Sequence, residues 1–373
     1  MTVGFDAPLP PARTGVADYA AALLGALRRR GTVEFMPRRA DVRLYHLGNN
    51  HVHSDVYRRA LAEPGVVVLH DAVMQHFFLG SLDERSYIEE FVYNYGEWHR
   101  EAAREMWRHR ASSAFRERYY AYPMLRRIAE VSCAVVVHNP AAVRIAREHA
   151  PGARVVEIAH LFAAPPTPHA AEVVRFREAL GLSSRDFLFA VFGYLRESKR
   201  VMSVLRAFEA IHRKLPNTAL LLAGEFASPD LARAVEPLLA DRPGILRLGH
   251  LAEREFWLAA SACDACINLR YPAAGETSGI AVRLMGTGKA VFLTESEESS
   301  RIPETACLRI PHGVAETASL TEHSILAALL PQTTREIGRR AAGHVQTFHS
   351  LDRVADKYWE TLCACRHSSP SSV

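Results

Sequence analysis

The chain has 373 residues, of which 49% are hydrophobic and 23% are charged, and its formal net charge is +4. This length favours two domains over one, and the composition is typical of a globular protein in water, not of a disordered or membrane-embedded chain. The mild positive charge is far from the concentrated basic surface of a nucleic-acid-binding protein, but it is compatible with an anionic substrate or a lipid surface.

The N-terminal segment MTVGFDAPLPPART has no basic region followed by an apolar run, so it does not resemble an export signal and we expect a cytoplasmic protein. After its prolines, Thr14 can cap an apolar helix that begins at Gly15. Small residues at this junction would let a ligand approach the backbone closely. The same segment is also consistent with an ordinary turn that binds no ligand.

Short apolar and β-branched runs alternate with helical stretches along both halves of the chain. Strands that are apolar almost throughout are typical of parallel sheets covered by helices on both faces. The alternation therefore predicts an α/β fold with a doubly wound parallel sheet in each half. The predicted strands span residues 43–47, 65–69, 134–137, 154–159, 187–192, 219–223, 245–248, 265–269 and 290–293.

Two of these strands end in the similar sequences VVVLHD and VVVHNP. They place His70 and Asp71 after one strand, and His138 and Asn139 after another. Ligands of open α/β sheets gather at the carboxyl ends of the strands, so these side chains are candidates for a site. The alternative is that each histidine is only a hydrogen-bonded residue at the rim of the fold.

The strand pattern stops between about residues 83 and 132, where helical segments rich in aromatic residues and arginine predict an insertion in the N-terminal half. Arg100, Arg104 and Arg108 recur every four residues and so share one helix face. This face is either a basic surface for an anionic lipid or lipid-linked acceptor, or a solvated helical face, because glutamates follow the same spacing beside it.

The proline-rich segment FAAPPTPH, residues 162–169, is predicted to link the two domains. Beyond it, the strand at residues 187–192 leads into FGYLRESKR. Gly193 ends that strand, and Arg196 and Lys199 follow in the turn before the next helix. Cations at the carboxyl end of a strand are placed where they could neutralise a diphosphate.

The six cysteines are scattered, which is not the pattern of a disulfide framework. Cys263 and Cys266 form a CxxC without a second pair, so we expect two buried small side chains and not a zinc site. The chain has no HExxH, no DxD after a strand, no GxSxG, no Walker A loop and no GxGxxG. The sequence therefore lacks the motifs that are typical of metal sites, hydrolases, kinases and dehydrogenases. We expect no metal and no other cofactor.

The segment GETSGIAVRLMGTGKAV, residues 275–291, places one carboxylate and several small residues before an apolar helix. Glu276 lies where a loop ends. Thr277, Ser278 and Gly279 can cap the helix, and their backbone N–H groups can also point at a phosphate. A plain helix cap and an anion site are both consistent with this segment alone.

Taken in order, these segments resemble the retaining glycosyltransferases of family 4, also called group 1. The resemblance runs from the glycine loop through FGYLRESKR, LLLAGEF and LGHL to the tail HSLDRVADKYWETL, which looks like the family's last helix crossing back to the N-terminal domain. It implies the GT-B fold, with two facing Rossmann-like domains. We then expect an acceptor-side domain over residues 1–165, completed by a helix near 350–365, and a nucleotide-sugar-binding domain over residues 175–348.

The resemblance also implies a donor-binding set around the diphosphate, the sugar and the base. That set comprises Gly15, Gly193, Arg196, Lys199, Leu248, Gly249, His250, Glu276, Thr277, Ser278 and Gly279. Within it, Lys199 would hold the diphosphate and Glu276 would bind sugar hydroxyls. His70 would approach the transferred sugar from the other domain, which makes His70 and Glu276 the catalytic candidates. The acceptor side would include Tyr19, Asp71 and His138.

The chain departs from the family pattern at two positions. The family's second glutamate, eight residues after the first, falls here at Arg283, in a stretch one residue shorter. Arg283 is either a phosphate ligand or a surface arginine of the helix. Where the family often has an arginine after the first glycine of the FG segment, this chain has Tyr194, and Arg196 is within reach to replace it. These departures leave the donor sugar open.

The resemblance thus implies a metal-independent transferase of polysaccharide biosynthesis that moves a hexose-like sugar, with retention, from a nucleotide-diphosphate sugar to a glycan or lipid-linked acceptor. The expected partners are the nucleotide sugar and that acceptor, with peripheral contact to the inner face of the cell membrane and no nucleic acid. The alternatives on the same fold are a sugar-nucleotide epimerase, a phosphorylase, or a non-catalytic scaffold subunit.

Overall fold

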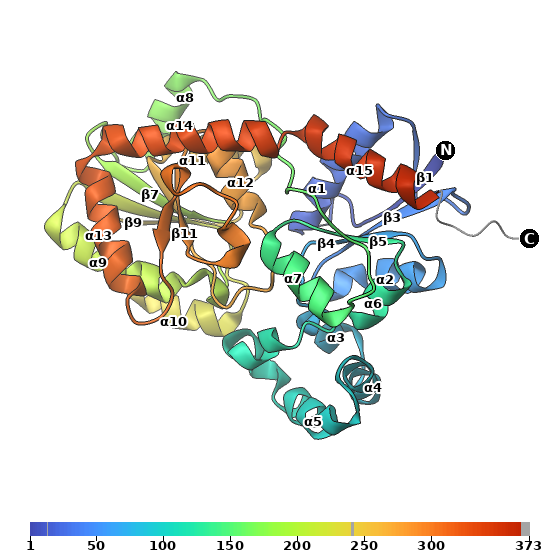
Figure 1. Cartoon of the computed structure of the whole chain (residues 1–373). Helices are drawn as coiled ribbons and strands as arrows, with labels where there is room; N and C mark the ends of the chain where they lie inside the picture. The colour runs from blue at the N-terminus through green and yellow to red at the C-terminus, as the bar shows by residue number, and fades with distance from the viewer. Residues whose placement is uncertain (13, 240–241, 367–373) are drawn as a thin grey trace, which may run out of the picture. The chain divides into compact units, whose positions relative to one another are not determined.

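The computed structural model describes residues 1–12, 14–239 and 242–366, which form two compact units (Figure 1). The first unit contains Met1–Leu161, the loop Pro272–Gly279 and the segment that starts at Phe348. The second contains Phe162–Tyr271 and Ile280–Thr347. Each unit holds one six-stranded sheet in which neighbouring strands are parallel. The predicted α/β fold is confirmed.

The first unit alternates strands with helices. Its strands are β1 (Thr2–Asp6), β2 (Thr32–Phe35), β3 (Val42–Leu47), β4 (Val66–Leu69), β5 (Ala134–Val137) and β6 (Val155–Glu157). Its helices are α1 (Gly15–Arg28), α2 (Ser54–Ala62), α3 (Gln75–Ser81), α4 (Glu84–Tyr95), α5 (Arg100–Arg108), α6 (Arg126–Val131), α7 (Pro140–His149) and α15 (Leu351–Arg366). Short 3-10 turns are η1 (His51–His53), η2 (Glu97–His99), η3 (Arg110–Phe115) and η4 (Glu117–Ala121).

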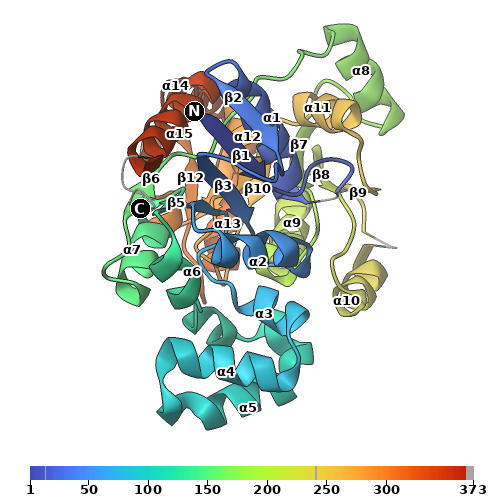
Figure 2. The ribbon, with the colours of Figure 1, turned by 90° about the vertical axis from the view of Figure 1, so that its right-hand side faces the viewer.

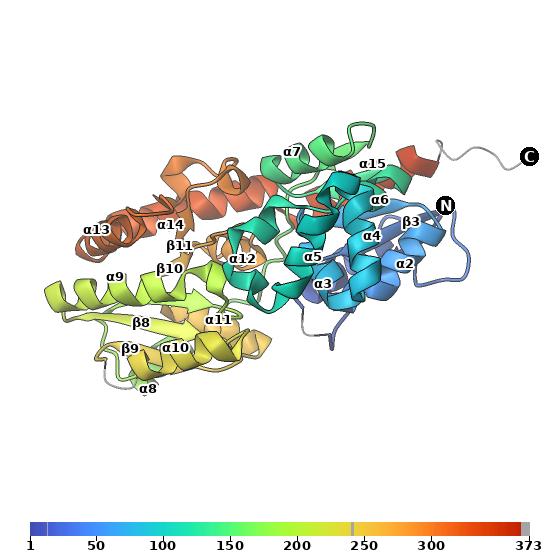
Figure 3. The same ribbon diagram turned by 90° about the horizontal axis from the view of Figure 1, so that it is seen from below.

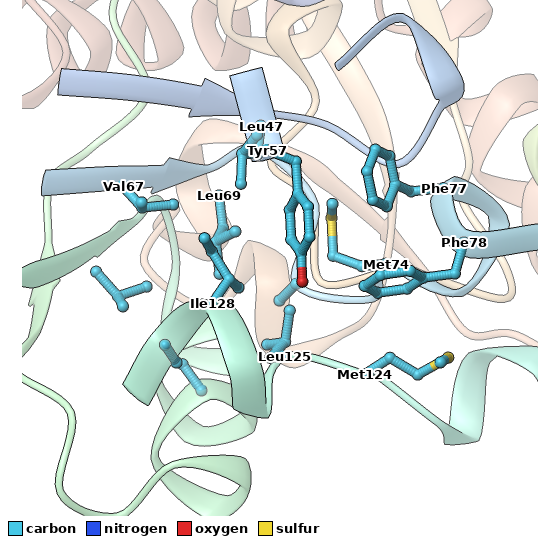
Figure 4. Packing of buried hydrophobic residues seen from close by; sticks show 14 of the residues in the cluster. Leu47, Tyr57, Val67, Leu69, Met74, Phe77, Phe78, Met124, Leu125 and Ile128 are labelled. Carbon is cyan, nitrogen blue, oxygen red and sulfur yellow. The ribbon is translucent and has the colours of Figure 1, made fainter. Parts of the chain in front are cut away.

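The strands of the first sheet run in the order β2-β1-β3-β4-β5-β6, and the four central strands are buried on both faces. Successive side chains point to opposite faces, so Tyr45 and Val67 join one core with α2 to α7, whereas Leu44 and Val66 join another with α1 and α15. Figure 4 shows the first of these cores. Its labelled side chains are Leu47, Tyr57, Val67, Leu69, Met74, Phe77, Phe78, Met124, Leu125 and Ile128.

The predicted helical insertion is present. Helices α4 and α5 lie below α3 in Figures 1 and 2 and pack side by side (Figure 3). Asp83 caps α4, since its Oδ1 accepts a hydrogen bond of 2.7 Å from the Ser86 amide. The helix ends at Gly96, whose φ of 88° suits glycine.

Helix α15 packs against α1 in the first unit (Figure 1). The hydroxyls of Tyr19 and Tyr358 share a hydrogen bond of 2.9 Å in the core between them. Arg29 pairs with Asp352 at 2.9 Å at the surface of this interface. Gly31 leaves room for the Trp359 ring, because a Cβ there would lie 2.3 Å from a ring carbon.

The second unit repeats the pattern. Its strands are β7 (Phe187–Phe192), β8 (Thr218–Ala223), β9 (Ile245–Leu248), β10 (Ala265–Asn268), β11 (Ala290–Thr294) and β12 (Leu308–Ile310). Its helices are α8 (Ala170–Ala179), α9 (Val201–Lys214), α10 (Pro229–Leu239), α11 (Glu253–Ala262), α12 (Gly279–Gly286), α13 (Glu316–Leu329) and α14 (Pro331–Phe348). Short 3-10 turns are η5 (Glu197–Lys199), η6 (Glu297–Ser299) and η7 (Glu304–Ala306).

The second sheet has the order β12-β11-β10-β7-β8-β9. Phe187 and Phe189 join a core with α9, α10 and α13, whereas Leu188 and Ala190 join a core with α11, α12 and α14. Among the described helices of the chain, none is long and apolar enough to cross a membrane.

All nine predicted strands are present, and the described residues contain three further strands that the sequence analysis missed. β1 is a five-residue strand interrupted by Gly4, where a Cβ would lie 3.0 Å from Ala40. β2 and β12 are short edge strands, at which apolar periodicity is weak. The predicted linker begins at Phe162, but this side chain is buried in the core of the second unit.

The Tyr19–Tyr358 pair makes a prediction about stability. Tyr19→Phe leaves the Tyr358 hydroxyl buried without a partner and should lower the free energy of unfolding by about 1–3 kcal/mol, whereas the double variant Tyr19→Phe/Tyr358→Phe should recover most of that loss. Urea unfolding of the wild type, both single variants and the double variant measures the cycle. Losses that simply add in the double variant would contradict a direct hydrogen bond.

Candidate functional site

Asn139 connects the carboxyl edge of the first sheet to the loop that carries Glu276. Its Oδ1 caps α7 by accepting a hydrogen bond of 2.9 Å from the Ala142 amide. Its Nδ2 donates to the Gly275 carbonyl and to Thr277 Oγ1, both at 3.0 Å. The sequences VVVHNP and GETSG, which lie more than one hundred residues apart, therefore meet within the first unit.

The end of β4 holds the same loop from a second side. The carbonyl of Ala274 accepts hydrogen bonds from the amides of Ala72 (2.8 Å) and Val73 (3.0 Å), just after His70 and Asp71. The approach is close because Gly275 has a φ of 68° and a Cβ there would lie 2.6 Å from Ala72 Cβ. The loop is thus fixed at the edge where α/β proteins bind ligands.

Within the loop, the Thr277 hydroxyl forms hydrogen bonds with residues that follow β5 of the first sheet. It accepts from Asn139 and donates to the carbonyl of His138 at 3.3 Å. Helix α12 begins two residues later, at Gly279. The Thr277 hydroxyl is therefore hydrogen-bonded to the edge of the first sheet. Glu276 is half-buried, and its Oε2 accepts a hydrogen bond of 2.6 Å from the Ala274 amide.

A cluster of histidine rings surrounds His70. His70 shares a hydrogen bond of 3.0 Å with His46 of β3, through His46 Nδ1 and His70 Nε2. The His70 and His138 ring centroids are 5.1 Å apart, and the Tyr19 ring meets His70 edge-on at 4.7 Å. In the described part of the chain, no three histidine, cysteine or acidic side chains are grouped so that they could hold a metal ion.

Burial keeps these imidazoles neutral near pH 7. Desolvation lowers the pKa of His46 to about 3 and the pKa of His138 to about 4. The pKa of His70 lies well below its usual value, because of desolvation first and of the neighbouring histidines second. His138 donates through Nδ1 to the Ile158 carbonyl at 2.8 Å. The cluster can offer hydrogen bonds to a ligand, but it brings no positive charge.

Two expected acceptor-side residues contact protein groups. Tyr19 is only 3% exposed and its hydroxyl is bonded to Tyr358, so it holds the rings of the cluster in place. Asp71 is half-buried, and its Oδ2 accepts a hydrogen bond of 2.8 Å from the Asn49 amide. Gly15 is the first residue of α1, and Thr14 caps this helix by accepting from the Ala17 amide at 3.1 Å, as predicted.

The second unit gathers cations at the carboxyl ends of β7 and β10. Lys199 is 5% exposed, and its Nζ donates to the carbonyl of Phe192, the last residue of β7. Burial, and then the nearby charges of Arg270 and Arg196, hold the pKa of Lys199 well below its ordinary value. An anion at this point would relieve the repulsion and favour the charged ammonium.

The turn after β7 depends on two glycines. Gly193 has a φ of 77°, and a Cβ there would lie 2.3 Å from the Ile280 side chain and 3.2 Å from Lys199 Nζ. Gly224, at the end of β8, approaches so closely that its Cβ would lie 2.2 Å from the Gly193 carbonyl oxygen. Glycine at these positions lets Ile280 and Lys199 pack directly against the turn.

The base-contact candidates lie at the end of edge strand β9. The carbonyl of Leu248 accepts a hydrogen bond of 3.1 Å from the Gly224 amide, which links this strand end to the neighbouring turn. Gly249 and His250 follow and are exposed. Cys263 and Cys266 are buried, as predicted, and their sulfur atoms are 3.3 Å apart.

Arg283 is engaged within the second unit. Its Nη2 donates to Glu253 at 2.6 Å, and its guanidinium lies 4.3 Å from the ring centroid of Phe256 and 4.4 Å from that of Trp257. These contacts join α12 to α11 and account for Arg283 without a phosphate.

Two residues of these clusters were missed by the sequence analysis. Arg270 follows β10, the strand beside β7, and a cation directly after an apolar strand was the same signal that indicated Arg196 and Lys199. His46 lies inside the strand VRLYHL, where a histidine has no sequence signal other than its place among buried residues.

The buried histidines make the first unit sensitive to acid. The unfolded chain binds protons at an ordinary histidine pKa of about 6.5, whereas folded His46 and His138 do so only near about 3 and about 4. The unfolded state therefore binds more protons below about pH 6.5, and each such histidine should remove up to about 1.4 kcal/mol of unfolding free energy per pH unit as the pH falls.

Urea unfolding between about pH 7.5 and pH 5 measures this dependence. His46→Gln should make it shallower by about one proton's contribution. His109→Gln is the control, since His109 is exposed in the folded protein as well. An unchanged slope in His46→Gln would argue against a neutral, buried His46.

No protein-family model matches the chain, and no curated protein matches it in sequence. Solved structures do match it. HepE from Anabaena, in complex with UDP and glucose, aligns with a TM-score of 0.69 and 14% identity over 98% of this chain and 100% of that one. Sucrose-phosphate synthase from Thermosynechococcus elongatus aligns at 0.68 and 14%, over 99% of each chain. WaaG, a glycosyltransferase involved in lipopolysaccharide biosynthesis, aligns at 0.62 and 14%, over 97% of this chain and 99% of that one. The chain therefore has the GT-B fold of two Rossmann-like domains.

Proposed function

We propose that this protein is a glycosyltransferase that moves a hexose-like sugar from a nucleotide-diphosphate sugar to a glycan or lipid-linked acceptor, with retention of the anomeric configuration. The observation that carries the proposal is buried Lys199, held with Arg196 and Arg270 at the ends of two adjacent parallel strands. The GT-B fold, which HepE shares in a complex with UDP and glucose, supports it.

The cation cluster suits a diphosphate leaving group. As the bond between the sugar and the diphosphate breaks, negative charge grows on the phosphate oxygens. Cations placed beside the leaving group stabilise that charge, most strongly where the cation is buried. Lys199 is buried, Arg270 is half-buried and Arg196 is exposed. Lys199 and Arg196 would supply this stabilisation, and Arg270 would add to it. No metal ion is needed in this proposal.

The loop at Glu276 would orient the sugar. Its carboxylate is proposed to bind sugar hydroxyls, and the backbone N–H groups of Thr277, Ser278 and Gly279 to meet the distal phosphate. His70 is proposed to contact the transferred sugar as a neutral hydrogen-bonding group. In the retaining step, the acceptor oxygen forms its bond to the anomeric carbon on the face that the diphosphate leaves, and the acceptor proton passes to the leaving phosphate oxygen.

We further propose that the protein works in the cytoplasm and reaches a lipid-linked acceptor by peripheral contact with the membrane. Trp98, which is 99% exposed in the helical insertion, supports such a contact, because indole side chains favour the membrane–water interface. The paired arginines of α5 do not contribute to this argument, since Arg100 and Arg104 form ion pairs with glutamates.

Donor turnover tests the function. Purified protein is incubated with UDP, GDP, ADP and dTDP sugars, and release of the nucleotide diphosphate is measured. We expect turnover of one of these donors, and Lys199→Met should reduce its rate by about 100-fold or more, because the leaving charge loses its main cation. Lys214→Met is the control, since Lys214 is exposed at the far end of α9.

The alternatives give different results. Turnover of no donor by the wild type would favour a binding or scaffold subunit. Conversion of a nucleotide sugar into its epimer, or release of a sugar phosphate from a glycan, would favour the epimerase or the phosphorylase. A full rate in Lys199→Met would mean that the phosphate role of Lys199 is wrong.

The low pKa of Lys199 predicts proton uptake on donor binding. A bound diphosphate favours the protonated ammonium, so its affinity should fall as the pH rises, and up to one proton should be taken up for each nucleotide bound. Calorimetric titration with UDP in buffers of different ionisation enthalpy measures the uptake. Lys199→Met should abolish it, and uptake of the same size in this variant would assign the proton to another group.

A further inference from the structure

An open cavity of about 500 Å³ lies at the surface of the first unit, apart from the histidine cluster, and its lining residues Arg108 and Arg110 are exposed. His76, Leu79 and Gly80 of α3 line one side, and Arg108, Arg110 and Ser113 line the other. The volume falls within the range of small-molecule sites, which is roughly 300–1,000 Å³. None of the functional roles proposed above uses this cavity.

The arginines of α5 divide into two groups. Arg100 is paired with Glu89 and Glu97, and Arg104 is paired with Glu101, so these guanidinium groups are neutralised at the helix surface. They lie on the same face of α5 as Arg108 but do not line the cavity. Arg100 and Arg104 therefore serve as controls for Arg108 and Arg110, because their charges are already paired with carboxylates.

Arg108 and Arg110 have no carboxylate partner among the residues that the structure describes. Glu105 is within electrostatic reach of Arg108, but it forms its ion pair with Arg118 at 2.9 Å. Two exposed guanidinium groups that form no ion pair with a described carboxylate therefore line one cavity.

One of these guanidinium groups is held in place by the protein. Arg110 Nη1 donates to the carbonyl of Trp107 at 2.8 Å, and its guanidinium lies 4.3 Å from the centroid of the indole ring. A planar guanidinium fixed in this way keeps its other N–H groups available for a bidentate contact with an oxyanion. Because the side chain is already ordered, binding loses little further entropy.

The cavity is also connected to the strand edge that carries His70. Asn49 Nδ2 lies 3.3 Å from His76 Nδ1, and the backbone N–H of Asn49 donates to Asp71 Oδ2 at 2.8 Å. Asp71 directly follows His70 in the chain. A ligand in the cavity would thus contact a wall that is hydrogen-bonded to this edge of the first sheet.

We propose that this cavity binds an oxyanion, a phosphate or carboxylate group carried by the sugar acceptor. Arg108 and Arg110 supply the charge, and the Ser113 hydroxyl can supply a further donor. The assignment of the oxyanion to the acceptor rests on the proposed glycosyl transfer, whereas binding of an oxyanion in this cavity does not.

The test measures binding directly, without turnover. The full-length protein is labelled with 5-fluorotryptophan, and the Trp107 resonance, assigned with the variant Trp107→Phe, is followed by fluorine NMR during titration. The probes are inorganic phosphate and glucuronate, at constant ionic strength and with saturating UDP present to occupy the donor site. We expect a saturable shift of this resonance with at least one probe.

The variants make the result specific to the cavity. Arg108→Gln/Arg110→Gln should weaken binding by about tenfold or more, which corresponds to the loss of charge-assisted hydrogen bonds. Arg100→Gln/Arg104→Gln removes two charges from the same helix face and should leave the affinity within about twofold of the wild type, because those charges are already paired. Arg104, Arg108 and Arg110 are exposed and Arg100 is half-buried, so the fold should tolerate these changes.

Three results would overturn the proposal: no shift with either probe, equal weakening by the two double variants, or a shift caused only by phosphatidylglycerol vesicles and not by the soluble anions. The last would indicate a lipid surface site instead. Failure of the proposed function can be distinguished from failure of this proposal. If the protein binds phosphate in this cavity but turns over no nucleotide sugar, the oxyanion site is supported and only its assignment to a sugar acceptor is wrong.

Discussion

The candidate site of the first unit depends on the hydrogen bonds that the Asn139 side chain makes. Its oxygen caps α7, and its nitrogen donates to Gly275 and Thr277 of a loop far away in sequence. An amide can satisfy both tasks at once because it carries an acceptor and two donors. Since its partners are buried or half-buried, loss of this group would leave several polar atoms unpaired at the strand edge.

The two units treat charge in opposite ways. In the first, burial keeps His46, His70 and His138 neutral, so the strand edge offers hydrogen bonds without charge. In the second, burial of Lys199 and the nearby charges of Arg270 and Arg196 lower the pKa of the Lys199 ammonium. The proposed roles follow this difference: the second environment would bind a diphosphate and the first would bind sugar hydroxyls.

Much of the fold could be predicted from the sequence because parallel strands covered on both faces are apolar throughout, as in VVVL and FLFAVF. Edge strands such as β2 and β12 were not predicted, because they are partly exposed to solvent and need not be apolar throughout. The candidate residues Lys199 and Glu276 could be identified because they follow strands or precede a helix. The tie between Asn139 and the Glu276 loop could not, since no local pattern indicates contacts between segments more than one hundred residues apart.

The sequence by itself determined the alternation of strands and helices, the helical insertion, and which side chains stand at strand ends, because each of these depends on neighbouring residues. The tertiary structure alone decided what those side chains contact. It showed that Thr277 serves the first sheet, that Arg283 pairs with Glu253, and that Arg108 and Arg110 lack the carboxylates that Arg100 and Arg104 have. The physical reason is that the environment of a charge or a hydrogen bond depends on burial and on partners that only folding brings together.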